Sequence, residues 1–313
     1  MSEGQRLEVR KSLVLTDARK EKVRLLVRSS KKVWHDFRKS IGGMFGLTVL
    51  VIFALMAVFA PLLATHKNPN EVSYWERVNP ANHPPSLKFF FGTDASGRDV
   101  YSLTIWGSRA SLIVGFVASV ISIVLGTSIG LVAGFFGKVS DEVLMRFTDF
   151  FLVIPWFPLM IVFSMLLGKS FLNVIIVIGI TSWPSTARIV RSQVLSVKEK
   201  AFIERARSVG SGSGRIISRH ILPNVFPLIF ANTVLLVANS IFSESFLDFF
   251  GFGDSRVVSW GTMLENSYEA GAFASSAWWW IFFPGVSIVL LIMAFYLIGD
   301  ALDDVLNPKL RHR

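Results

Sequence analysis

Six apolar segments of this 313-residue chain contain no Asp, Glu, Lys or Arg. Each is about as long as a helix that crosses a bilayer, roughly 20 residues. Lipid offers no partners for backbone N–H and C=O groups, so such segments fold as helices that satisfy those groups internally. The chain is therefore predicted to be an all-α, polytopic membrane protein with six transmembrane helices. The segments are 41–64, 112–136, 150–168, 170–187, 224–243 and 278–299.

Basic side chains are distributed unevenly between the predicted loops. If the N-terminus is inside, 25 of the 32 Lys and Arg residues lie in inside segments and seven lie in outside loops. This asymmetry follows the positive-inside rule and predicts a multi-pass protein of the cell membrane with both termini cytoplasmic. The net charge of +10 then reflects topology and attraction to anionic membrane lipid, and we expect no binding of nucleic acid.

The spans divide the chain into five parts. We expect a cytoplasmic N-terminal tail with an interfacial amphipathic helix, a first span, an extracellular loop whose Pro and Asn residues favour turns, a core domain and a short cytoplasmic tail. The core domain contains five spans and a cytoplasmic polar loop, residues 188–222. The five parts are 1–40, 41–64, 65–110, 111–305 and 306–313.

Three features of the spans concern their packing. Small residues recur every four positions in the second span, at Ser122, Gly126, Gly130 and Gly134. This face is predicted to pack closely against a neighbouring span, rather than to line a path. Pro155 predicts a bend in the third span, which would serve either as a gate or as a shaped wall. The three tryptophans at 278–280 are expected to anchor the sixth span at the membrane interface rather than to bind sugars.

The chain lacks the residue patterns of a catalytic or metal site. It has no cysteine, its five histidines share no ligand spacing, and no glycine-rich stretch has the spacing of a phosphate-binding loop. We expect no cofactor, no metal and no enzymatic activity, so the energy for uphill transport would come from a partner or an ion gradient. Among the few carboxylates near the spans, Glu244 is the candidate for facing a translocation path. An ion-coupled carrier or channel is the remote alternative, because the acidic residues form no deep relay.

The polar loop contains a recognisable motif. Glu204-Arg205-Ala206 is followed four residues later by Gly210 and twelve residues further on by Leu222-Pro223. This order and spacing resemble the EAA motif of ABC importer permeases. The ending with His220 resembles the oligopeptide/dipeptide branch of that family. Arg205 departs from the motif, which usually has alanine there, and His220 replaces its usual isoleucine.

Further landmarks resemble the same branch in order and spacing, and the likeness covers about residues 40–310. They are Gly92-Thr93-Asp94, Gly97-Arg98-Asp99, Arg146 with Asp149 and Pro155, Ser245-Phe246-Leu247, Gly251-Phe252-Gly253, Ser259-Trp260-Gly261, and Gly299-Asp300.

The resemblance implies a type I ABC importer permease fold and the role of second permease subunit in an ATP-driven importer. It implies four kinds of partner: a second homologous permease, two ATP-binding cassette subunits that bind the ATP, an extracellular substrate-binding protein, and membrane lipid. The exposed glycine and serine faces of the spans are then expected to pack against the second permease. Peptides are the family's usual cargo, and oligosaccharides are the alternative.

The resemblance also assigns a role to the polar loop. In such permeases the short helix near residues 201–210 docks in a groove of the ATPase and transmits its closure. Glu204 is expected to anchor this contact; the alternative is that it only caps and solubilises the loop helix. The predicted coupling residues are Ala201, Phe202, Glu204, Arg205, Ala206, Ser208, Val209 and Gly210, and the motif ends at His220, Leu222 and Pro223.

Overall fold

The computed structural model describes residues 31, 33–65 and 80–306. Within these residues the fold is all-helical, and the one β pairing is an isolated bridge between Thr93 and Asp99. The helices are α2 Ile41–Val58, α3 Ala60–Leu63, α5 Val100–Phe136, α6 Lys138–Val153, α7 Trp156–Leu167, α8 Phe171–Thr181, α9 Trp183–Lys198, α10 Ala201–Ser208, α11 Ser213–Ile216, the π-helix η1 Ile217–Ile221, α12 Leu222–Phe249, α13 Trp260–Glu269 and α14 Trp278–Leu306. The predicted tails, 1–40 and 306–313, lie mostly outside the described residues.

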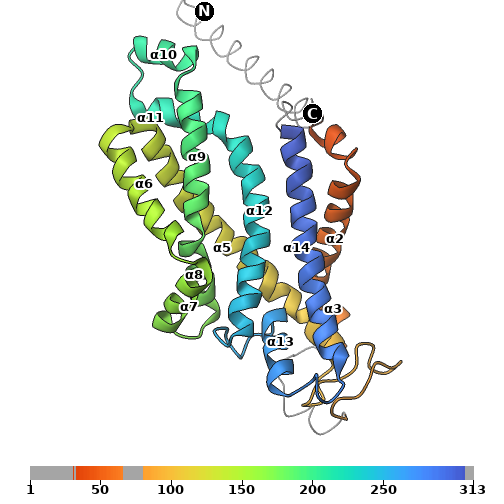
Figure 1. The fold of residues 1–313 in the computed structure, drawn as a ribbon. Coiled ribbons are helices and arrows are strands. Elements are labelled where there is room, and N and C mark those ends of the chain that lie inside the picture. Colours follow the sequence, from red (N-terminus) through yellow and green to blue (C-terminus); the bar gives the residue numbers. More distant parts are fainter. Residues whose placement is uncertain (1–30, 32, 66–79, 307–313) are drawn as a thin grey trace, which may run out of the picture.

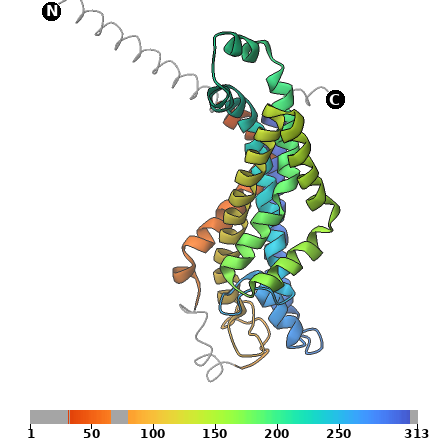
Figure 2. The same cartoon turned by 90° about the vertical axis from the view of Figure 1, so that its left-hand side faces the viewer.

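The helices form an elongated bundle (Figure 1). Five helices of the described chain are long and apolar enough to cross a membrane, or six if the bent pair α6–α7 counts as one span. The short helices α10 and α11 lie at one end of the bundle, the same end as the start of α2 and the end of α14. The opposite end carries α13, and the view in Figure 2 shows the same arrangement from the side. We call these the polar-loop end and the α13 end.

Helix α5 is longer than the apolar segment that predicted it. It begins at Val100, because the carboxylate of Asp99 caps it by accepting a hydrogen bond of 3.1 Å from the Ser102 amide. Residues 100–110, which the sequence assigned to the extracellular loop, are therefore helical. Arg109 and the polar residues of these first turns interrupt the charge-free apolar run, so that run alone does not mark the start of the helix.

The predicted bend in the third span is present and sharp. Helices α6 and α7 meet at an angle of 92° around Ile154 and Pro155. Proline has no N–H to donate to the preceding turn, so the helix stops there and a new one starts. The apolar segment 150–168 is thus the end of one helix and the whole of another, and the bent pair runs from Lys138 to Leu167.

The small-residue face of α5 packs against α9, as its spacing predicted. A Cβ atom added at Gly126 would lie 2.7 Å from the carbonyl oxygen of Trp183, and one at Gly130 would lie 2.6 Å from that of Ala187. The two backbones are therefore in direct contact along the stripe. On α5 this face is therefore not one of the exposed faces that could meet a second permease, because α9 of the same chain covers it.

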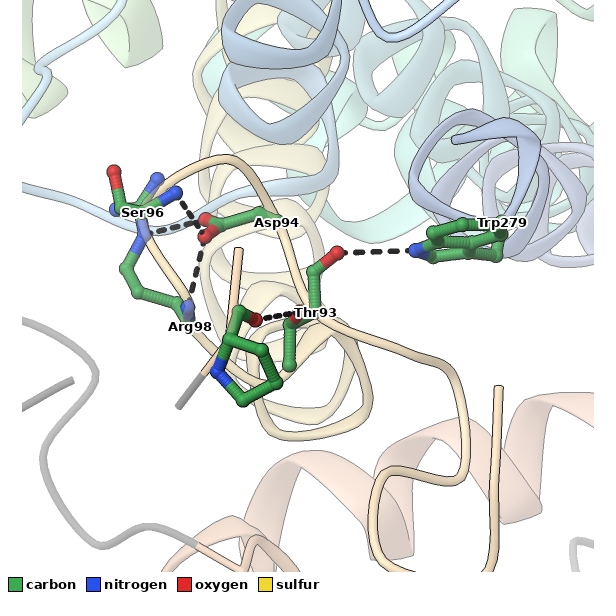
Figure 3. A network of polar contacts seen from close by, with 6 residues as sticks. Thr93, Asp94, Ser96, Arg98 and Trp279 are labelled. Carbon is green, nitrogen blue, oxygen red and sulfur yellow. Dashed lines mark hydrogen bonds and ion pairs between the residues drawn. The ribbon is translucent and has the colours of Figure 1, made fainter. Parts of the chain in front are cut away.

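Hydrogen bonds from tryptophans secure the α13 end. The indole of Trp260, which is fully buried, donates to the carbonyl oxygen of Thr104 at 2.9 Å. The indole of Trp279 donates to the carbonyl oxygen of Thr93 at 3.0 Å (Figure 3). Trp279 and Trp280 are buried, and only Trp278 of the three is exposed. The predicted interfacial anchoring is therefore wrong for two of them, which serve as core residues.

Candidate functional site

Helix α10 of the polar loop has one apolar face and one polar face. Ile203 and Ala206 are buried in an apolar cluster with side chains from α5, α9, η1 and α12. Glu204 and Arg205 are exposed on the other side. Because the apolar face fixes the helix on the bundle, the polar face is held in a defined orientation at the tip of the molecule (Figure 1).

Glycine at position 210 ends α10 for a conformational reason. Gly210 has φ of +78°, in the left-handed region that glycine adopts without strain. Its amide donates to the carbonyl oxygen of Arg207 at 2.9 Å, and the Ser211 amide donates to that of Ala206 at 3.0 Å. These two bonds form a Schellman motif, which stops the helix sharply. No atom of the described residues lies within 4 Å of the Cβ that another residue would carry at this position, so the surface of the described chain is open there.

The charged side chains of α10 and of the adjoining end of α9 differ in their contacts. Glu204 forms no ion pair and no side-chain hydrogen bond with any residue in the described part of the chain. It therefore does not cap the helix through a hydrogen bond. The guanidinium of Arg207 lies 5.8 Å from the ring centre of Phe135 on α5, and the ammonium of Lys198 lies 5.9 Å from the same ring. These cation–π contacts hold the loop against the end of α5.

The other predicted coupling residues share this end of the molecule. Ala201, Arg205, Ser208 and Val209 are exposed, whereas Phe202 is half-buried. The ring of Phe202 lies 6.3 Å from the ring of His220, measured between centroids. The structure thus brings the start of the motif close to its end.

The motif ends in a local distortion of the helix. Residues Ile217–Ile221 form a π-helix, and Pro223 follows in the first turn of α12. Leu222 is half-buried and Pro223 is exposed. Single π turns inside α-helices occur often at functional sites. Here the π-helix joins the short α11 to the long α12 without interrupting the chain of helical turns.

Glu244 lies far from the polar loop, in the interior of the subunit. Its side chain is 1% exposed, and its two oxygens each accept from the Ser111 hydroxyl at 3.1 Å. Ser245 donates to Oε2 at 3.0 Å. One turn further along α12, Asp248 accepts from the Ser259 hydroxyl at 2.5 Å. In this conformation Glu244 does not reach the subunit surface, and its role in a translocation path stays a prediction.

A second polar feature escaped the sequence analysis. A cavity of about 390 Å³ lies beside the bend between α6 and α7, and its wall includes Ser182, Thr186, Asn232 and Asn239. The sequence signal was two carboxamides seven residues apart within an otherwise apolar span. Neither residue is charged, so the pattern of charged groups gave no signal for this cavity.

Comparison with known proteins identifies the class. Residues 126–312 match the family described as binding-protein-dependent transport system inner membrane component. The chain belongs to this family and is a multi-pass permease subunit of an ABC transporter in the cell membrane. Such a subunit is not catalytic and needs no cofactor of its own, because ATP is bound by the ATPase of the complex. The complex also includes a binding protein.

Individual relatives are similar to the chain over most of its length. Residues 30–85 match the N-terminal transmembrane domain of oligopeptide transport permease C. The chain is 37% identical to the dipeptide transport system permease protein DppC of Alkalihalophilus pseudofirmus, over 90% of each chain. It is 35% identical to the oligopeptide transport system permease protein OppC of Bacillus subtilis, over 91% of this chain and 92% of the relative.

A solved structure supports the fold. The chain is similar to a chain of the MetNI methionine ABC transporter in an inward-facing conformation, with a TM-score of 0.52 and 19% identity. The match covers 66% of this chain and 95% of the other. At this identity the likeness concerns the fold alone, and it confirms the predicted ABC importer permease architecture.

Proposed function

We propose that this chain is the second permease subunit of an ATP-driven peptide importer and forms half of its translocation path. Its partners are a second homologous permease, two ATP-binding cassette subunits and an extracellular binding protein that delivers peptides. The relatives named above, which transport dipeptides and oligopeptides by name, support the choice of peptides. The polar-loop end is then cytoplasmic, as the distribution of basic residues predicts.

One observation carries the coupling role. Helix α10 is fixed to the bundle by a buried apolar face, yet the Glu204 carboxylate at the tip of the molecule has no partner among the described residues. A rigid element that two states of a partner can displace is a common means of transmitting a conformational change. Closure of the ATPase would push on α10, and the buried contacts of Ile203 would pass that push to α9 and α12.

The test uses the complete importer reconstituted in liposomes, with uptake of a labelled tripeptide and ATPase activity both measured. A charge-assisted hydrogen bond contributes about 1.5–3 kcal/mol. Glu204→Ala should therefore weaken docking of the ATPase by roughly ten- to a hundredfold. Gly210→Trp should block docking by bulk and by strain. Glu142→Ala is the matched control, because Glu142 is an exposed carboxylate near the start of α6 and outside the polar loop.

The result separates the alternatives. Loss of uptake and of binding-protein-stimulated ATPase activity in both loop variants, with the control unchanged, supports the coupling role. Normal uptake in both variants would show that Glu204 only solubilises the loop. Uptake of a labelled oligosaccharide by the wild-type importer, with no uptake of peptide, would show that the transported substrate is an oligosaccharide. It would leave the proposed coupling role of the polar loop unchanged.

A further inference from the structure

The cavity beside the α6–α7 bend lies at a depth where polar groups are costly. Its wall includes residues near the middle of two candidate membrane spans, Phe171–Lys198 and Ser213–Phe249. No residue of its wall is charged, yet hydroxyl and carboxamide groups gather there. Polar side chains inside a membrane protein usually face the bundle interior or a water-filled space, and they mark solute pathways.

Two further observations indicate that the cavity is suited to a polar occupant. The backbone is non-helical around Ile154 and Pro155, and irregular backbone at membrane depth is tolerated only inside protein or along a wet cavity. The hydroxyl of Ser182 and the indole N–H of Trp156 also belong to residues of the cavity wall. Both groups are buried without a hydrogen-bond partner in the described chain.

The two asparagines offer complementary groups. The Nδ2 of Asn232 donates to the Thr186 hydroxyl at 3.0 Å, and its Oδ1 forms no hydrogen bond with the described residues. The Oδ1 of Asn239 accepts from the Tyr296 hydroxyl at 3.0 Å, which leaves its Nδ2 as a donor. Asn232 therefore presents an acceptor and Asn239 presents a donor.

The spacing of this pair matches a peptide main chain. Residues seven apart lie on the same face of an α-helix and about 10 Å apart along its axis. An extended peptide advances about 3.3 Å per residue, so about three residues cover this distance. A peptide N–H could meet Asn232 while a C=O about three residues away meets Asn239.

We propose that the transported peptide contacts this subunit in the cavity, through main-chain hydrogen bonds to Oδ1 of Asn232 and Nδ2 of Asn239. The proposal rests on the proposed function and adds the contact residues. Every peptide carries the same main-chain groups, and the wall has no charge that would select between side chains. The site therefore accepts peptides of different sequence, while the binding protein selects among them.

The first experiment measures uptake and ATPase activity of the complete importer in liposomes. Asn232→Leu and Asn239→Leu should each lower peptide uptake about tenfold, the effect of one lost hydrogen bond. Binding-protein-stimulated ATPase activity should stay near the wild-type value, because the polar loop is untouched. Phe230→Leu is the control, since Phe230 is exposed on α12 about 200° around the helix from Asn232. Wild-type uptake in both asparagine variants would overturn the proposal.

The second experiment tests contact directly and does not depend on transport rates. The chain contains no cysteine, so Asn239→Cys, Ser185→Cys and the control Phe230→Cys each introduce its single thiol. A charged thiol reagent is applied to the vanadate-trapped complex, and labelling of this chain is read by mass spectrometry. Peptide should protect the thiols at positions 239 and 185 and leave the control unaffected.

Three outcomes would overturn the proposal. Equal labelling with and without peptide would mean that no solute enters. Complete protection in the absence of peptide would mean that a helix of the second permease fills the cavity. Low uptake in the leucine variants without protection would mean that the asparagines only pack the helices. If the wild-type importer carries an oligosaccharide instead, the function proposed above fails. Protection of the thiols at positions 239 and 185 by that oligosaccharide then shows separately whether a transported solute enters the cavity.

Discussion

The hydroxyl of Ser111 on α5 donates to the carboxylate of Glu244 on α12, at 3.1 Å from each oxygen. These residues are 133 positions apart in the chain, and both are buried. A buried carboxylate requires such partners, because an unpaired polar group in the interior is costly. The contact joins two long helices of the bundle near the α13 end.

Replacing Glu244 should separate a structural role from a role in transport. Glu244→Ala removes the acceptor and leaves a void, so we expect the free energy of unfolding to fall by about 2–5 kcal/mol. Glu244→Gln keeps the shape and an acceptor and should cost less than about 1.5 kcal/mol. The measurement is the thermal unfolding midpoint of the purified complex. If Glu244→Gln leaves the midpoint unchanged but lowers uptake, the predicted path role is supported despite the burial.

The contact between α5 and α9 predicts sensitivity to a single methyl group. Gly130→Ala places a Cβ 2.6 Å from the carbonyl oxygen of Ala187, so the helices must separate at a cost of about 1–3 kcal/mol. Gly285→Ala in α14 is the matched control, since nothing lies within 4 Å of its Cβ. Yield and unfolding midpoint in detergent should fall only for the first variant. Equal midpoints would contradict the close approach of the two helices.

The end of α10 predicts opposite effects of two neighbouring glycine substitutions. Gly210→Ala forces a side chain into the left-handed region, which costs about 1–2 kcal/mol. Gly214→Ala lies in α11, has no such backbone conformation and meets no neighbour, so it should be neutral or slightly stabilising. Limited proteolysis of the polar loop should become faster for the first variant alone. Unchanged cleavage of Gly210→Ala would mean that the Schellman turn does not hold the loop.

Two aspartates near the α13 end predict stability changes of opposite sign with pH. Burial raises the pKa of Asp94 above the usual aspartate value, although Arg98 opposes the shift. The stability linked to Asp94 is thus complete below the usual pKa and is lost as pH rises through the raised pKa. The hydrogen bond from Arg256 lowers the pKa of Asp254. The stability linked to Asp254 is present above the usual pKa and is lost as pH falls through the lowered value.

The test compares unfolding midpoints of wild type, Asp94→Asn and Asp254→Asn between about pH 3 and pH 7, a range that spans the usual aspartate pKa. The unfolding midpoint of wild type, measured relative to that of Asp94→Asn, should increase as pH falls. The unfolding midpoint of wild type, measured relative to that of Asp254→Asn, should increase as pH rises. Parallel curves for all three proteins would refute both assignments.

Several features followed from the sequence alone. Each span was recognisable because a long charge-free segment is stable in lipid whatever surrounds it. The bend at Pro155 was predictable because proline lacks an N–H donor wherever it occurs. Gly210 belonged to a motif whose order and spacing lie within the polar loop itself. These properties are local, so short stretches of sequence determine them.

Only the tertiary structure decided which face of each span meets which neighbour. Lipid tails are about as apolar as leucine, so the sequence of a span can indicate a side suited to close packing but not which helix packs there. For this reason the sequence indicated close packing of the small-residue face of α5 without identifying its neighbour, which the structure shows to be Ala187 and the residues around it on α9. The burial of Trp279, the contact of Glu244 with Ser111, and the gathering of Asn232 and Asn239 at one cavity likewise depend on how distant helices pack.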